Sequence, residues 1–189
     1  TIRNPLYHWT HMELNRPFGI NTLLLNEDTA KTIWDKGNAK LATADFTTQG
    51  ILHKMNVEIV CTTDDPVDSL EYHKAYKNAS KKKTKTKLIP AWRPDKAMAV
   101  ENPVTYNQYL DKLSEVTGQE IVRFSDLLNA LKKRQVFFRE NGCKLSDHGI
   151  ESIYYDEYTD AEIRSIFNKI RGGNMLEKHE INKFKYAML

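Results

Sequence analysis

The sequence has no long apolar run and few cysteines. None of its hydrophobic stretches approaches the roughly 20 residues of a membrane helix, so we expect no membrane association. Cys61 and Cys143 each lie in an apolar run that enters a predicted strand, where free thiols are more common than disulfides in a reducing compartment. The first residues do not show the charged-then-apolar pattern of a secretory leader. These absences favour a cytoplasmic protein.

Several catalytic motifs are missing as well. The sequence contains no glycine-rich phosphate loop, no Ser-His-Asp order and no Cys-x-x-Cys pair, which disfavours nucleotide binding and nucleophilic catalysis. The net charge is only +3, and much of the local excess lies in SKKKTKTK, residues 80–87. That run has no aromatic or glycine partners, so we interpret it as a solvated loop and expect no nucleic-acid partner.

The pattern of predicted helices and strands divides the chain in two. Residues 1–56 indicate short helices, one of them capped by Asn4 with Pro5 in its first turn. From residue 57 onward, predicted strands alternate with predicted helices. The strands are VEIVCTTDDP (57–66), KLIPAW (87–92) and a short third one, CKLSDHG (143–149). Because crossovers between parallel strands need a dozen or more residues, this order predicts an α/β fold with about three parallel strands and extra helices.

Capping residues indicate where several helices begin and end. Asp65 and Pro66 predict the start of a helix over 67–79, and the spacing of Thr105 and Gln108 predicts another. Gly118 would end that second helix. A capping box from Thr159 to Glu162 starts a further helix, and the last one runs to the end of the sequence. Since the chain begins without methionine and stops within an amphipathic pattern, we expect it to be a piece of a longer protein.

Charged residues gather just past the ends of the three predicted strands. In parallel sheets these carboxyl ends share one edge, so we expect the side chains to converge there. An arginine at such a position can grip a carboxylate or phosphate with two hydrogen bonds, or form a salt bridge at the rim with Asp95. A histidine next to Asp147 can transfer protons or cap the following segment. The candidate site residues are Asp64, Arg93, Asp95, Asp147 and His148.

The other acidic and histidine residues are weaker candidates. Asp64 and Asp65 could act as paired carboxylates, although a capping role already explains Asp65. His8 and His11 are spaced for one helix face, but they lack a third ligand, so we expect surface or packing roles and no metal site. The remaining histidines occupy ordinary amphipathic helix positions: His53, His73 and His179.

Four separated stretches resemble the uronate isomerase (glucuronate isomerase) family of the amidohydrolase superfamily. They occur in the expected order and together cover essentially the whole chain as a central segment of the family's length. The four stretches are NPLYHWTHMELNRPFGI, CTTDDPVDSLEYH, WRPDKAM and NGCKLSDHG.

This resemblance implies a (β/α)8 TIM barrel of which the chain supplies one arc. It also implies an aldose–ketose isomerase that interconverts D-glucuronate with D-fructuronate, and D-galacturonate with D-tagaturonate. By similarity, Arg93 and Asp95 bind the hexuronate substrate, with Arg93 near its carboxylate. His148, Asp147 and Asp64 become candidates for the catalytic groups.

The same resemblance implies a divalent metal, zinc in the first instance, in the intact parent. The family's His-x-His ligands belong to an earlier strand and its metal-binding aspartate to the last strand, so we expect no metal in this segment. We expect the segment alone to be inactive and, with open strand edges, to self-associate. Two alternatives stay open: a stand-alone helical interaction module with a basic loop, and a related metallo-hydrolase.

Overall fold

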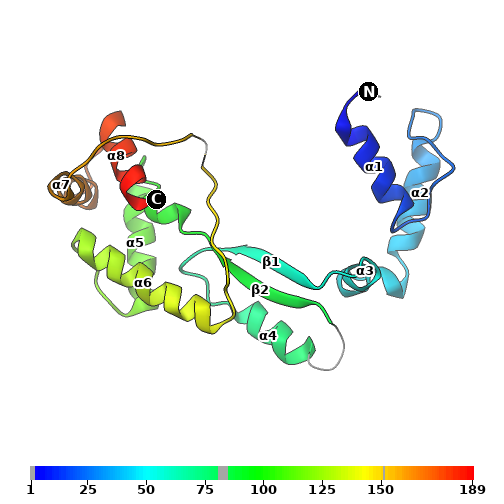
Figure 1. The fold of residues 1–189 in the computed structure, drawn as a ribbon, viewed down its shortest axis with the longest axis horizontal. Coiled ribbons are helices and arrows are strands. Elements are labelled where there is room, and N and C mark those ends of the chain that lie inside the picture. The colour runs from blue at the N-terminus through cyan, green and yellow to red at the C-terminus, as the bar shows by residue number, and fades with distance from the viewer. Residues whose placement is uncertain (1–2, 81–84, 151) are drawn as a thin grey trace. The chain divides into compact units, whose positions relative to one another are not determined.

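The computed structural model describes residues 3–80, 85–150 and 152–189 (Figure 1). Helices dominate, and the strands are short. The elements are α1 (Pro5–Asn15), α2 (Ala30–Leu41), η1 (Ala44–Phe46), α3 (Thr48–Lys54), β1 (Ile59–Asp64), α4 (Glu71–Ser80), β2 (Lys87–Trp92), η2 (Asp95–Met98), α5 (Pro103–Thr117), α6 (Phe124–Glu140), α7 (Asp160–Arg171) and α8 (Lys178–Met188). This is an α/β fold.

The chain divides into two compact units. One contains the N-terminal residues to Val60 together with Asn78–Lys87, and the other contains Cys61–Lys77 with Leu88–Leu189. The predicted boundary between residues 56 and 57 stays a prediction. Of the basic run, residues 81–84 lie outside the described residues. No helix in the described ranges is both long and apolar enough to cross a membrane.

The first unit is helical and has a small core. As predicted, Asn4 caps α1: its side chain accepts a hydrogen bond of 3.0 Å from the Leu6 amide. His11 joins α1 to the following loop, because its Nε2 accepts from the Leu25 amide at 2.9 Å and its Nδ1 lies 2.7 Å from the Tyr7 carbonyl oxygen. Both ring nitrogens are therefore used, which agrees with a packing role. Ile20, Ile33 and Phe46 are buried in this unit.

Within the described residues the sheet has two strands, β1 and β2, which lie side by side in Figure 1. The two strands run parallel, since the Lys87 amide donates to the Glu58 carbonyl and the Arg93 amide donates to the Asp64 carbonyl. The predicted third strand is present only as one parallel bridge between Trp92 and Ser146. Its pairing is short: among the described residues, the backbone bonds are those of Trp92 with Leu145 and with Asp147, both at 3.1 Å.

The connection from β1 to α4 corrects one predicted helix start. The helix begins at Glu71 and not directly after Asp65. Asp65 instead forms a tight turn, in which its side chain accepts from the Val67 amide at 3.1 Å and its own amide donates to Asp68 at 2.7 Å. Leu70 then adopts a positive φ of 55°, which is incompatible with a continuous helix.

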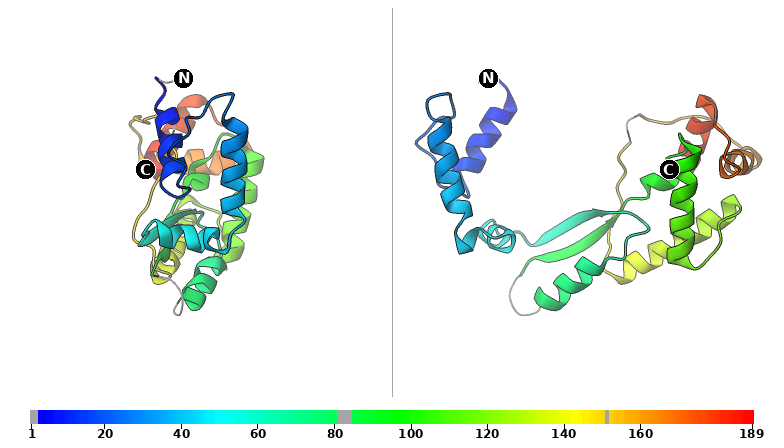
Figure 2. Two further views of the ribbon diagram at one scale, coloured as in Figure 1. Left: turned by 90° about the vertical axis from the view of Figure 1, so that its right-hand side faces the viewer. Right: turned by 180° about the vertical axis from the view of Figure 1, so that it is seen from behind.

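Helices α5 to α8 lie close together (Figure 2). Their buried side chains form the main hydrophobic core. Its largest fully buried side chains include Tyr106, Phe167 and Phe184. The predicted capping box of α7 is confirmed: Thr159 and Glu162 exchange side-chain-to-amide hydrogen bonds. Helix α5 begins earlier than the Thr105–Gln108 spacing predicted, because Asn102 caps it with bonds to two backbone amides. Gly118 ends it in the left-handed region at φ 62°, as predicted.

Candidate functional site

Side chains at the carboxyl ends of the strands alternate between two faces. Trp92 packs edge-on against Phe138 of α6, with ring centroids 5.1 Å apart, so it faces the helices. Its bridge partner Ser146 lies in the same register. Arg93 and Asp147 come one position later, and successive strand residues point to opposite faces. They therefore point away from the face that α6 covers.

Arg93 and Asp147 form an ion pair on that second face. The Arg93 Nε donates to Asp147 Oδ1 at 3.1 Å, and Nη2 donates to Oδ2. This hydrogen bond raises the pKa of Arg93 above its ordinary value and holds the pKa of Asp147 below its own. Their side chains are 34% and 41% exposed, so the pair is accessible to a ligand.

His148 and Asp95 form a second pair at the same end of the strands. The His148 Nδ1 lies 2.9 Å from Asp95 Oδ1, and the Gly149 amide donates to Asp95 Oδ2 at 2.7 Å. Both side chains are 28% exposed. His148 also contributes to a cavity of about 370 Å³ beside α6 and α8, with Trp92, Pro94, Gln135 and others in its lining.

The observed partners differ from those that the sequence suggested. Sequence proximity paired His148 with Asp147 and offered Asp95 as the salt-bridge partner of Arg93. The structure pairs Arg93 with Asp147 and His148 with Asp95. Neighbouring residues of an extended segment point in opposite directions, so adjacency in sequence separates their side chains.

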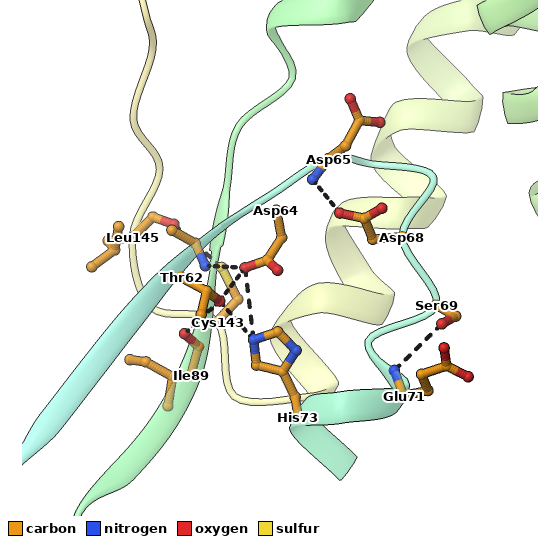
Figure 3. A network of polar contacts seen from close by, with 11 residues as sticks. Thr62, Asp64, Asp65, Asp68, Ser69, Glu71, His73, Ile89, Cys143 and Leu145 are labelled. Atoms are coloured by element: carbon orange, nitrogen blue, oxygen red, sulfur yellow. Dashed lines mark hydrogen bonds and ion pairs between the residues drawn. The ribbon is translucent and has the colours of Figure 1, made fainter. Parts of the chain in front are cut away.

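Asp64 belongs to a buried network between the sheet and α4 (Figure 3). Its Oδ2 accepts from the Thr62 hydroxyl at 2.5 Å and from the Ala91 amide at 3.2 Å. The His73 Nε2 lies 2.6 Å from the Thr62 oxygen and 3.7 Å from Asp64. Asp64 and His73 are each 8% exposed. The expected convergence of all candidates on one rim is thus met only in part, because Asp64 faces α4.

The proton positions in this network follow from counting donors. A carboxylate only accepts, so the Thr62 hydroxyl hydrogen is directed to Asp64. The Thr62 oxygen then accepts from His73, whose Nε2 must carry a hydrogen. Every close contact of the Asp64 oxygen is with an element of the fold: β1, β2 or α4. The network connects the end of β1 to α4 and leaves this oxygen little freedom to act on a ligand.

Asp65 is held by different partners from those of Asp64. Its Oδ1 accepts from the Tyr109 hydroxyl at 3.1 Å, and its Oδ2 lies 3.4 Å from the Lys96 ammonium. Burial, followed by the negative charge of Asp65, raises the pKa of Tyr109. The two adjacent aspartates therefore do not form a paired-carboxylate site.

Sequence reasoning missed Arg134 and understated His73. Arg134 of α6 is buried, and it donates to the carbonyl oxygens of Pro66 at 2.6 Å and Asp68 at 2.7 Å. It also stacks on Phe137, and burial lowers its pKa. Arg134 lies on the same face of α6 as the buried Leu127 and Ala130. A charged residue at helical spacing from apolar positions was the available signal. For His73 the signal was its place on the sheet-facing side of the helix that follows β1.

The described ranges contain no group of three or more His, Cys, Asp or Glu side chains that could hold a metal ion. The charged groups that the structure does bring together are organised in pairs. What the strand ends offer is an accessible arginine anchored by a carboxylate, and a histidine oriented by another. Such an arrangement can bind an anion and move a proton.

Comparisons with known proteins identify the family of this chain. A family model described as glucuronate isomerase matches residues 1–189. The uronate isomerase of Phocaeicola vulgatus is 56% identical over 189 residues, which is all of this chain and 40% of that protein. That of Bacteroides thetaiotaomicron is 53% identical with the same coverage. The chain thus spans about 40% of the length of these relatives.

Solved structures agree. The crystal structure of uronate isomerase from Thermotoga maritima matches with a TM-score of 0.83 and 38% identity, over 99% of this chain and 40% of that one. The glucuronate isomerase structure from Caulobacter crescentus, at 24% identity and a TM-score of 0.86, covers 99% of this chain and 38% of its own and supports the fold alone. The chain belongs to the glucuronate isomerase family.

Proposed function

We propose that this chain is a segment of a uronate isomerase whose intact form interconverts D-glucuronate with D-fructuronate, and D-galacturonate with D-tagaturonate. The observation that carries the proposal is the family match along all 189 residues. The Arg93–Asp147 pair at the strand ends supplies the matching chemistry, a cation presented to an acidic sugar. The intact enzyme is the polypeptide that contains this chain together with the rest of its isomerase.

Arg93 is the group that we assign to the substrate carboxylate. Asp147 occupies its Nε and one side of Nη2, and Nη1 has no hydrogen-bond partner in the part of the chain that the structure describes. A planar guanidinium can bind one carboxylate along one edge and a second along the other. In this proposal Asp147 holds the plane of Arg93 in a fixed orientation and does not itself transfer protons.

His148 is the group that we assign to proton movement. Isomerisation transfers a proton from C2 to C1 of the sugar through an enediol, and the oxygens at these carbons exchange their hydroxyl and carbonyl roles. His148 is partly exposed and lines a cavity. Because Arg93 and His148 point to different sides of the strand ends, a hexuronate would lie across the rim to reach both. We assign Asp64 to the fold and not to catalysis.

The remaining architecture is also part of this proposal. β1 and β2 would form neighbouring strands of a (β/α)8 barrel in a cytoplasmic member of the amidohydrolase superfamily. The family resemblance implies a divalent metal, but the described residues do not form a ligand set for one. In this segment β1 has β2 as its neighbour on one side, and the open edge would be paired by other strands of the intact enzyme or by self-association.

The experiment compares the intact enzyme with the isolated segment on D-glucuronate and D-galacturonate, following ketose formation. We expect turnover by the intact enzyme and none by the segment, which size-exclusion chromatography should show to be associated. Arg93→Lys should raise the KM for D-glucuronate by about tenfold to a hundredfold, the range for a lost charge-assisted hydrogen bond. Lys31→Arg, on an exposed helix of the first unit, is a matched control.

Three results would contradict parts of this proposal separately. An intact enzyme that converts neither hexuronate would remove the assigned function. Native-like turnover by the segment would show that the chemistry is complete within it. An unchanged KM in Arg93→Lys would remove Arg93 from the substrate carboxylate while leaving the function in place.

A further inference from the structure

We propose that Asp95 is a positioning residue that keeps His148 in one tautomer, with the hydrogen on Nδ1 and the Nε2 lone pair presented to the cavity. This deepens the proposed function and rests on it, because His148 would accept the substrate proton at Nε2. It reassigns Asp95, for which the family resemblance had implied a substrate-binding role. The juxtaposition that carries the inference is the contact between Asp95 and both His148 and Gly149.

The tautomer follows from the partners of the imidazole. Asp95 Oδ1 lies 2.9 Å from Nδ1, and a carboxylate can only accept a hydrogen bond. Nδ1 must therefore carry a hydrogen and donate it. In the neutral ring this leaves Nε2 as an acceptor. Nε2 has no hydrogen-bond partner within residues 3–80, 85–150 and 152–189, so its lone pair is free for a ligand.

Asp95 is fixed independently of His148. Its second oxygen accepts from the Gly149 backbone amide at 2.7 Å, so both oxygens of the carboxylate have a partner. A Cβ added to Gly149 would lie 3.1 Å from that same oxygen, which shows how closely the backbone approaches the carboxylate. Asp95 is also the first residue of η2, whose Ala97 and Met98 are buried. The carboxylate is thus anchored from two segments before it orients the imidazole.

Asp147 cannot take this role, although it is next to His148 in sequence. Both of its oxygens are engaged by Arg93. Asp64 cannot take it either, since it contacts Thr62, Ala91 and His73. Of Asp64, Asp95 and Asp147, only Asp95 contacts His148 among the described residues. The arrangement of histidine oriented by a carboxylate at one nitrogen and open at the other is a general design for a base.

The decisive variant is Asp95→Asn, which keeps the shape and changes the hydrogen-bonding pattern. The side-chain amide has one acceptor and one donor group. The Gly149 amide is a fixed donor and will take the oxygen, which leaves the NH2 group facing His148. Nδ1 must then accept, so neutral His148 is forced into the Nε2–H form and loses the lone pair that the reaction needs.

Two readouts on the intact enzyme test this. Long-range 1H–15N correlation spectra of 15N-histidine-labelled enzyme report which nitrogen is protonated, with the His148 signal assigned by its loss in His148→Gln. We expect Nδ1–H in the wild type and Nε2–H in Asp95→Asn. With D-glucuronate as the probe, kcat of Asp95→Asn should fall about a hundredfold while KM changes little. Asp35→Asn, in an exposed ion pair on α2, should change neither.

The outcomes separate this inference from the proposed function. A wild-type His148 in the Nε2–H form, or an Asp95→Asn variant with unchanged kcat, would overturn the positioning role while leaving the isomerase intact. The wild-type spectrum needs no variant, so it decides the tautomer even where Asp95→Asn fails to fold. An intact enzyme with no activity on either hexuronate would remove the function but not the tautomer assignment.

Discussion

Two histidine–aspartate pairs lie near the ends of the same strands, and they differ in burial and in the distance between the partners. His73 and Asp64 are each 8% exposed, lie 3.7 Å apart and are bridged by Thr62. His148 and Asp95 are in direct contact at 2.9 Å, and both are 28% exposed. The first pair connects β1 to α4. In the second pair one imidazole nitrogen has no partner among the described residues, and His148 lines a cavity.

The difference shows how the surroundings of a pair decide its role. Removing a partner from a buried hydrogen-bonded group leaves other groups unsatisfied, so the first pair should matter most for stability. A partly exposed pair can exchange its hydrogen bonds with water at small cost. The second pair should therefore matter little for stability and much for activity.

The largest effect on stability is expected at Asp64. Asp64→Ala removes the acceptor of the Thr62 hydroxyl and the Ala91 amide and leaves His73 without its nearby negative charge. We expect the free energy of unfolding of the intact enzyme to fall by about 3 kcal/mol, measured by urea denaturation followed by circular dichroism. Asp95→Ala is the matched control and should cost about 1 kcal/mol or less. Equal losses in the two variants would remove the distinction between the pairs.

A smaller effect is expected when the bridge alone is removed. Thr62→Val keeps the side-chain volume but removes the hydroxyl between His73 and Asp64. The first pair then has no bridging group, like the second pair, but its partners lie further apart. We expect the free energy of unfolding to fall by about 1–2 kcal/mol, the cost of leaving one buried polar group without its hydrogen-bond partner. Thr10→Val, on α1, is a control for the loss of a hydroxyl whose hydrogen bond, to the Leu6 carbonyl, is exposed. A neutral effect of Thr62→Val would mean that the pair needs no bridge.

The sequence predicted the elements better than it predicted the contacts between them. The apolar β-branched runs located β1 and β2, and Thr159 with Glu162 located the start of α7, because these signals are local. The start of α5 was predicted too late, since Asn102 competes with Thr105 for the same capping role. Local chemistry alone does not decide between two such caps.

The candidate site was predicted as a set of residues but not as a set of pairs. Arg93, Asp95, Asp147 and His148 do lie at the strand ends, as parallel topology required. Their partners could not be predicted from adjacency, because pairing depends on which face each side chain occupies and therefore on register. The bond from the Asp147 amide to the Trp92 carbonyl sets that register, and it is a long-range contact.

The Arg93–Asp147 pair supplies a pH test of the comparison. Arg93 holds the pKa of Asp147 below its ordinary value of 3.8, chiefly through the hydrogen bond. A depressed pKa means that the pair contributes stability above pH about 4, which is lost as the pH falls through the lower, folded value. In Arg93→Gln we expect Asp147 to titrate closer to 3.8, as measured by 13C NMR of its carboxyl group.

Glu162 provides an internal control in the same spectra. Its pKa is lowered to about 2, mainly by the hydrogen bond from Lys183, which does not involve Arg93. It should therefore be unchanged in Arg93→Gln. An Asp147 that titrates identically in wild type and variant would show that the ion pair does not form in solution.

The smallest effect is expected from one added methyl group at the second pair. Gly149 has no positive φ, so alanine is compatible with its backbone, but the new Cβ would lie 3.1 Å from Asp95 Oδ2. A shift of a few tenths of an ångström relieves that contact and tilts the carboxylate that orients His148. We expect Gly149→Ala to lower kcat on D-glucuronate about twofold to fivefold, with a change in unfolding free energy below about 1 kcal/mol. Gly37→Ala, where a Cβ meets nothing within 4 Å, is the control. A stability loss without a change in kcat would instead place Gly149 and Asp95 among the groups that merely hold the fold.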